Sequence, residues 1–235
     1  MQKTKYPPLA AGDIFCWYND GMKLLLHTCC APCSVYCIKT LRAEGIEPTL
    51  YWFNPNIHPY TEYKARRDCL VEYAKLVNVD LRLDDAYGLD EFCKNVSGKL
   101  TTRCVDYCYP KRLRQACEYA KANGFDAIST TLLYSIYQKH DFIAKLMIEL
   151  AEEYGLEFVY RDFREGWREG QDEARRVGLY MQKYCGCVFS EEESMIGRKI
   201  GKQMQKKGIS PTNANVREVI ERSKVDGLVR DAFDV

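Results

Sequence analysis

Residues 23–45, KLLLHTCCAPCSVYCIKTLRAEG, place a strand, a cysteine loop and a helix one after another. The apolar run at 23–27 predicts a short buried strand, and the spacing of residues 34–44 predicts a helix. Gly45 follows at the position where a left-handed residue ends a helix at low cost. The stretch is therefore expected to be the first strand, loop and helix of an α/β fold.

The same alternation continues along the chain. We expect further strands at 49–53, 81–83, 126–130 and 157–160, and helices at 61–77, 89–96, 109–123, 140–154 and 171–177. Strands that alternate with helices form a mostly parallel sheet, wound right-handedly and covered by helices on both faces. The predicted fold class is α/β.

The C-terminal part differs from the rest of the chain. Between Met195 and Gly208 the sequence has five basic residues and no acidic one. We therefore expect two parts, an α/β domain at 1–193 that carries the cysteines and a basic helical extension at 194–235.

Composition narrows the class of protein. A chain of 235 residues with 46% hydrophobic and 29% charged residues is typical of a globular protein that buries a core without crosslinks. A net charge of +1 is too balanced to indicate nucleic acid by itself. No apolar run approaches the roughly 18 residues that cross a membrane, and no export signal is seen, so a cytoplasmic location without membrane partners is expected.

Twelve cysteines are the most informative feature of the composition. In a reducing cytosol such a density indicates metal binding or redox chemistry rather than structural disulfides. Seven of them fall into three loop clusters: Cys29, Cys30 and Cys33; Cys104 and Cys108; Cys185 and Cys187. One metal site needs about four protein ligands. Seven thiols therefore predict a cluster beside a second metal site, or a cluster beside a redox-active pair.

Local geometry favours dividing these thiols between centres. Adjacent residues such as Cys29 and Cys30 project in different directions in a strand or a helix, so they are expected to serve two neighbouring centres. Gly186 can adopt a positive φ that folds Cys185 and Cys187 toward one point, which suits chelation or a reversible disulfide. The other five cysteines are expected to be small buried hydrophobic residues.

Several oxygen and nitrogen donors are candidates because they follow predicted strands, where open sheets bind their ligands. Asp162 can ligate a metal or donate a proton, or else pair with a neighbouring arginine. His27 is either part of the site or a hydrogen-bonded core residue. His58 and His140 lie in loops, where proton transfer and pairing with a polynucleotide both stay open.

The strings HTCCAPCS, YWFNPNIHPYTEYKAR, CYPKRL, STTLLYSIYQKHD and DFREGWREGQDEARRVGLYMQKYCGCVFS carry a family resemblance. Together, over residues 22–193, the chain resembles the QueH family of non-corrinoid epoxyqueuosine reductases. The resemblance implies a Rossmann-like fold related to PP-loop enzymes, without ATP. It implies reduction of epoxyqueuosine at the wobble position (34) of tRNA, the last step of queuosine biosynthesis, in tRNAs for Asp, Asn, His and Tyr.

The resemblance also implies the cofactors and their ligands. The family holds a [4Fe-4S] cluster and a nearby mononuclear metal, expected to be iron, and an external donor such as a ferredoxin or flavodoxin would supply electrons. Its metal ligands fall on Cys29, Cys30, Cys33, Cys104, Cys108, Cys185, Cys187 and Asp162. The family usually separates its two middle cysteines by two residues, whereas here three separate them. Cys108 keeps the register of the motif, so Cys104 is the displaced thiol.

Turning an epoxide into an alkene takes two electrons and two protons and releases water. We hypothesise that Asp162 completes the mononuclear site and that His58, Tyr134 or a water on the metal supplies protons. Phosphate contacts to the tRNA are expected from Arg66, Arg67, Lys111, Arg112, Arg114, Lys139 and the basic segment 195–208.

Two other functions compete with this interpretation. An ATP-dependent tRNA thiolase of the PP-loop type should have a glycine-rich loop after the first strand, but the loop here is TCCAPC. A non-enzymatic zinc-binding module would be colourless, whereas an iron-sulfur protein is brown. Seven thiols in three loops of an α/β sheet would be unusual for such a module.

Overall fold

A computed structural model of the chain describes residues 21–210, 216 and 218. Its centre is a five-stranded parallel sheet in the order β3-β2-β1-β4-β5. The strands are β1 (Leu24–His27), β2 (Pro48–Trp52), β3 (Leu81–Leu83), β4 (Ala127–Thr130) and β5 (Glu157–Phe158). The parallel sheet predicted from the alternating pattern is confirmed.

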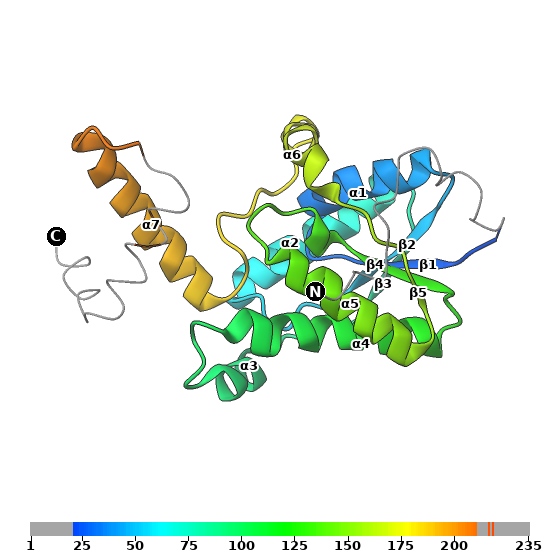
Figure 1. Cartoon of the computed structure of the whole chain (residues 1–235). Coiled ribbons are helices and arrows are strands. Elements are labelled where there is room, and N and C mark those ends of the chain that lie inside the picture. The colour runs from blue at the N-terminus through cyan, green and yellow to red at the C-terminus, as the bar shows by residue number, and fades with distance from the viewer. Residues whose placement is uncertain (1–20, 211–215, 217, 219–235) are drawn as a thin grey trace, which may run out of the picture.

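Helices cover both faces of this sheet (Figure 1). They are α1 (Ala31–Ala43), α2 (Tyr60–Leu76), α3 (Leu89–Val96), α4 (Tyr109–Ala122), α5 (His140–Tyr154), α6 (Trp167–Arg176) and α7 (Val188–Lys206). Helices α1, α2 and α6 lie on one face, and α4 and α5 pack together on the other. The α/β class and the two helical layers agree with the expectation.

The core forms around the central strand. Leu24, Leu25 and Leu26 of β1 are all buried, because helices shield the strand from both sides. Strand β1 pairs with β2 on one side and with β4 on the other, so the winding of the sheet reverses there. Such a reversal opens a crevice beyond the carboxyl ends of the strands. The cysteine loop after β1 lies at this point.

Two boundaries differ from the expectation in ways that matter for the cysteines. Helix α1 begins at Ala31 rather than at Ser34, because Pro32 fits the first turn, where its missing N–H costs nothing. Cys33 is therefore helical. The segment Cys104–Cys108 forms a π-helical turn that leads into α4, in a stretch where a loop was expected.

Helix α7 begins directly after Cys187 and continues past residue 193. The boundary expected between 193 and 194 therefore lies inside a helix. Residues 1–20, including Cys16, and most of 211–235 lie outside the described residues. Within the described part of the chain, the helices lack the combination of length and apolar character needed to span a bilayer.

Candidate metal centre

Cys29, Cys30 and Cys33, the first thiol group, come together where β1 passes into α1. Their three sulfur atoms all lie within 4.8 Å of one another, and 3.8 Å separates the sulfurs of Cys29 and Cys30. Regular strand or helix geometry would turn the adjacent pair apart. The pair lies in neither regular element, because Cys30 is the extended N-cap residue at which the chain turns from the strand into α1. The expected divergence of the pair is therefore absent, and all three sulfurs can face one metal ion.

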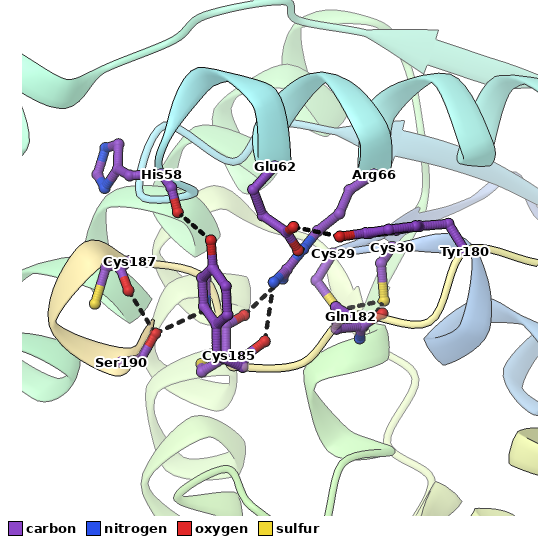
Figure 2. Close-up of polar contacts among 12 residues, drawn as sticks. Cys29, Cys30, His58, Glu62, Arg66, Tyr180, Gln182, Cys185, Cys187 and Ser190 are labelled. Carbon is purple, nitrogen blue, oxygen red and sulfur yellow. Dashed lines mark hydrogen bonds and ion pairs between the residues drawn. The ribbon is translucent and has the colours of Figure 1, made fainter. Parts of the chain in front are cut away.

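Polar side chains donate hydrogen bonds to these sulfurs. The amide nitrogen of Gln182 lies 3.0 Å from the sulfur of Cys30, and the Thr131 hydroxyl lies 3.5 Å from that of Cys29. Hydrogen bonds to sulfur stabilise the thiolate that a metal requires and tune the centre it forms. Figure 2 shows Gln182 beside the vicinal pair.

The three thiols of the first group differ in the direction in which their pKa values are shifted. Hydrogen bonds from Cys30 and Cys33 hold the pKa of the Cys29 thiol well below its usual value. Burial raises the pKa of Cys30, and the hydrogen bond to Cys29 raises that of Cys33. Cys29 is thus the thiol that loses its proton most readily, and an incoming metal would displace the protons that remain on the group.

The remaining clustered thiols, Cys104, Cys108, Cys185 and Cys187, form the second thiol group. A hydrogen bond from Cys108 lowers the pKa of Cys104 to about 6, while the pKa of Cys108 is raised by the same bond. Burial raises the pKa of Cys185 to about 11, and the charge of Cys104 adds to this effect. Cys108 and Cys187 also pack in one buried cluster, so the two loops approach each other.

The π-helical turn explains how Cys104 keeps its place. A helix absorbs one extra residue by widening a turn, and such π-bulges often occur at functional sites. The backbone N–H of Tyr109 donates to the carbonyl of Cys104 across this wide turn. Cys104 and Cys108, four residues apart, lie on one side of this turn, and their thiols share a hydrogen bond.

Residues 180–187, the 180–187 loop, are held in place from α2 (Figure 2). Arg66 donates to the carbonyls of Tyr184 and Cys185 at 2.9 and 2.7 Å, and its Nε contacts Glu62 at 2.6 Å. The Tyr180 hydroxyl donates to the same carboxylate. A loop without helix or strand is thus fixed by a buried ion pair on a neighbouring helix.

Gly186 fits this loop for a different reason from the one expected. It is not among the glycines with positive φ in the described residues. Its amide donates to the Ser190 hydroxyl and its carbonyl accepts from the His58 amide. A Cβ at this position would lie 3.3 Å from Cγ1 of Ile57. Close packing, rather than a left-handed backbone, favours glycine here.

The candidate acids and bases occupy three different environments. Asp162 caps a short 3-10 helix at 163–166 and pairs with the Arg164 guanidinium at 2.6 Å, which lowers its pKa. Its second neighbour is His140, with 3.6 Å between Nε2 and the carboxylate. Asp162 does not belong to the described group of donors within 4.8 Å of one another. Of the roles expected for Asp162, this structure shows the ion pair with a neighbouring arginine.

His58 and Tyr134 are both fully buried. Nε2 of His58 lies 3.1 Å from the carbonyl of Pro55, burial lowers its pKa to about 4, and its ring points away from Cys30 in Figure 2. The Tyr134 hydroxyl donates to the carbonyl of Trp167 at 2.9 Å, and burial raises its pKa. His27 is a core residue whose Nδ1 lies 2.9 Å from the Thr130 hydroxyl.

The predicted phosphate contacts divide by exposure. Arg66 and Arg112 are only 2% and 3% exposed, so their guanidinium groups face the cysteine loops rather than the surface. Three other candidates form ion pairs with acidic residues: Arg67 with Asp68 and Asp85, Lys111 with Glu91, and Arg114 with Glu153. Lys139 is exposed on the surface. Burial removes Arg66 and Arg112 from the residues that a phosphate can reach here.

Sequence reasoning missed the donors that surround the sulfurs. Gln138 donates to the sulfur of Cys185 at 3.3 Å, and Nε of Arg103 lies 3.4 Å from that of Cys187. Gln182 and Thr131 were missed in the same way. Thr131 and Gln138 lie in the motif after β4, and Gln182 lies three residues before Cys185, so proximity to a cysteine or a strand end was the available signal.

Comparison with known proteins gives one consistent result. The family model described as Epoxyqueuosine reductase QueH matches residues 24–193. A protein of that name from Dehalococcoides mccartyi is 37% identical over 73% of this chain and 93% of its own length. Those from Haemophilus influenzae and Thermotoga maritima are 34% and 31% identical, covering 73% and 76% of this chain and 73% and 97% of their own lengths.

Proposed function

Because the chain belongs to the epoxyqueuosine reductase QueH family, we propose that it reduces epoxyqueuosine to queuosine at the wobble position of tRNA. The observation that supports this most strongly is the first thiol group, whose three sulfurs come together where β1 passes into α1, within the matched residues. The reaction consumes two electrons and two protons, removes the epoxide oxygen as water and leaves an alkene. The enzyme is an oxidoreductase.

The donor set fits two metal centres. We assign the first thiol group to a mononuclear metal, expected to be iron, because three thiolates leave a coordination position open. The second thiol group has the four cysteines that a [4Fe-4S] cluster takes. When bound, these groups would supply single electrons and a Lewis acid for oxygen. Gln182, Thr131, Gln138 and Arg103 would hold the sulfurs in place through the hydrogen bonds described above.

Asp162 stays the proposed carboxylate ligand of the mononuclear centre, and reaching it would require the pair with Arg164 to open. Of the two proposed proton donors, Tyr134 is the better candidate at neutral pH. Its raised pKa keeps its proton on, whereas His58, with a pKa near 4, is a neutral imidazole. Burial is the largest cause of this shift of the Tyr134 pKa, and electrostatic coupling to Cys33 and Cys30 adds to it, which supports a role near the first thiol group.

We propose that the wobble base stacks on Tyr137. This side chain is 54% exposed, and the next residue, Gln138, donates to the sulfur of Cys185. Lys139 beside it is exposed and suited to a phosphate. An unstacked anticodon base binds well on an aromatic ring flanked by a cation. Electrons would come from an external donor such as a ferredoxin or flavodoxin, in the cytoplasm where tRNA is modified, without ATP.

The test is turnover after anaerobic reconstitution with iron and sulfide. The protein is incubated with epoxyqueuosine-containing tRNA and a chemical reductant, and the nucleosides are analysed by mass spectrometry. We expect queuosine from the wild type and from Cys93→Ser, an exposed cysteine outside both thiol groups, and none from Cys30→Ser. Intact epoxide with a full complement of iron in the wild type would contradict the proposal.

A further inference from the structure

Helix α7 carries a basic surface that the reaction itself does not use. Beyond Ser194 it has Arg198, Lys199, Lys202 and Lys206, while acidic residues are confined to its first turns at 191–193. At 100° per residue these four cations lie within an arc of about 100° on one side of the helix. All four are exposed. They form the α7 basic stripe.

The opposite side of α7 is apolar. Ile196, Ile200 and Met204 follow one another at intervals of four residues, and Ile196 is only 3% exposed, with the other two half-buried. A helix that binds a bilayer needs its apolar face free. Here the apolar side is partly buried and the exposed side is basic, so the chemistry of the exposed surface matches a polyanion rather than a lipid bilayer.

The N-terminal end of α7 is held beside the second thiol group. The helix starts directly after Cys187, and Arg103 contacts the sulfur of Cys187 at 3.4 Å and the carboxylate of Glu193 at 2.8 Å. The Ser194 hydroxyl also donates to the carbonyl of Lys183 at 2.9 Å. From its N-terminal end the helix projects away from the α/β domain (Figure 1). The rise of 1.5 Å per residue puts the stripe about 16 to 28 Å beyond Cys187.

We propose that the α7 basic stripe binds the phosphate backbone of the tRNA at a distance from the wobble nucleotide. The inference rests on the proposed function and adds a second contact region for the same substrate. The stripe lies outside residues 24–193, so it extends the matched core. Glu193 in the acidic first turns pairs with Arg103 beside Cys187, and the cations begin only further along the helix, which directs phosphates to its outer half.

The test compares full-length tRNA with a 17-nucleotide anticodon stem-loop. The variant Arg198→Gln/Lys199→Gln/Lys202→Gln/Lys206→Gln should bind full-length tRNA at least tenfold more weakly at low salt, and the slope of log K against log salt should become shallower by about 3. Its affinity for the stem-loop and its reduction of epoxyqueuosine in the stem-loop should stay at the wild-type level.

The matched control removes four exposed lysines from α2, α3 and α5: Lys64→Gln/Lys75→Gln/Lys94→Gln/Lys145→Gln. Equal losses in the variant and the control would overturn the proposal, and so would an unchanged salt slope. Loss of binding to anionic lipid vesicles with unchanged tRNA binding would overturn it in favour of a membrane. Failure of the wild type to reduce the stem-loop would instead count against the proposed function.

A second, independent observation concerns the charge of Arg112. It is 3% exposed, its Nε donates to the carbonyl of Cys108 at 3.0 Å, and its Nη1 lies 3.4 Å from Oδ1 of Asn54. The other buried arginines, Arg66 and Arg103, pair with Glu62 and Glu193. For Arg112, none of the described residues supplies a carboxylate as an ion-pair partner. A buried cation without a counter-charge is costly.

We infer that Arg112 is the counter-charge of the second thiol group and raises the reduction potential of the centre that this group holds. Its guanidinium is buried and hydrogen-bonded to the backbone of Cys108, so its positive charge lies beside the second thiol group. A positive charge beside a metal centre stabilises the reduced form, which carries one more electron.

The measurement is a redox titration of the reconstituted protein without tRNA, followed by absorbance. Arg112→Gln should lower the ratio of reduced to oxidised cluster at a fixed potential about tenfold, a shift of about 59 mV to more negative potential for one electron. Arg112→Lys keeps the charge and should stay near the wild type. An unshifted potential in Arg112→Gln would overturn the inference.

The iron content of the reconstituted Arg112 variants is a second measurement. If Arg112→Gln fails to take up iron, then Arg112→Lys carries the test. Normal iron content and potential in Arg112→Lys support the role of charge. Failure of both variants to load would overturn it, because the guanidinium shape rather than its charge would then be required.

Discussion

The first thiol group and the 180–187 loop reach the same edge of the sheet by different means. Cys29, Cys30 and Cys33 are positioned by the backbone, because β1 is paired on both sides and passes directly into α1. The 180–187 loop contains no helix or strand. It is positioned by side chains, above all Arg66, and Gln182 links it back to Cys30. One half of the site is thus built by local structure, and the other depends on tertiary contacts.

The largest expected effect comes from breaking the contact that holds the loop. Arg66→Met leaves the Glu62 carboxylate buried without its cation, so the free energy of unfolding should fall by about 3–5 kcal/mol. Urea denaturation measures it. Arg67→Met, which removes the partly exposed pairs with Asp68 and Asp85, should cost at most about 1 kcal/mol. Equal losses in the two variants would mean that the buried pair does not hold the loop.

Acid tests the same region through His58, whose amide donates to the carbonyl of Gly186. Its pKa is about 4 in the folded protein and 6.5 as its ordinary value, so the unfolded chain binds more protons between these limits. The free energy of unfolding should therefore fall by about 2 kcal/mol from pH 6.5 to 4.5 on account of His58. Urea denaturation of His58→Asn at a series of pH values should lack this contribution of His58 to the fall in the free energy of unfolding. An unchanged pH dependence in that variant would show a hydrated imidazole.

Packing of the loop has a smaller expected effect. Gly186→Ala places a methyl group 3.3 Å from Ile57, and the free energy of unfolding should fall by about 1 kcal/mol. Ile57→Ala removes the opposing atoms, so the double variant should lose less than the sum of the single losses. Additive losses in a double-mutant cycle would show that the two residues do not meet.

The link between the two regions has the smallest expected effect on stability. Gln182→Ala removes the donor to Cys30 and should lower the free energy of unfolding by about 0.5 kcal/mol. Alkylation of the metal-free protein, followed residue by residue with mass spectrometry, should show altered reactivity at Cys30. Cys69, which contacts the Tyr180 amide instead, serves as the unaffected control. An altered rate at both residues would point to a general loosening.

The same contrast decides what could be predicted from the sequence. The sheet, the helices and the three cysteine clusters follow from hydrophobic periodicity and turn residues, which are local. The burial of Arg66 and Arg112 could not be predicted, because an arginine on a helix is usually solvated and only the tertiary fold turns these two inward. The π-helical turn at Cys104 and the pairing of Asp162 with Arg164 also depend on neighbours that a linear pattern does not show.

The central claim is that the two thiol groups hold two different metal centres. It is tested most directly by iron content and Mössbauer spectra of the reconstituted variants Cys30→Ser and Cys187→Ser, with Cys93→Ser as control. We predict that Cys30→Ser loses the single iron and keeps the cluster spectrum, whereas Cys187→Ser loses the cluster and keeps the single iron. Loss of the same species in both variants would contradict the account.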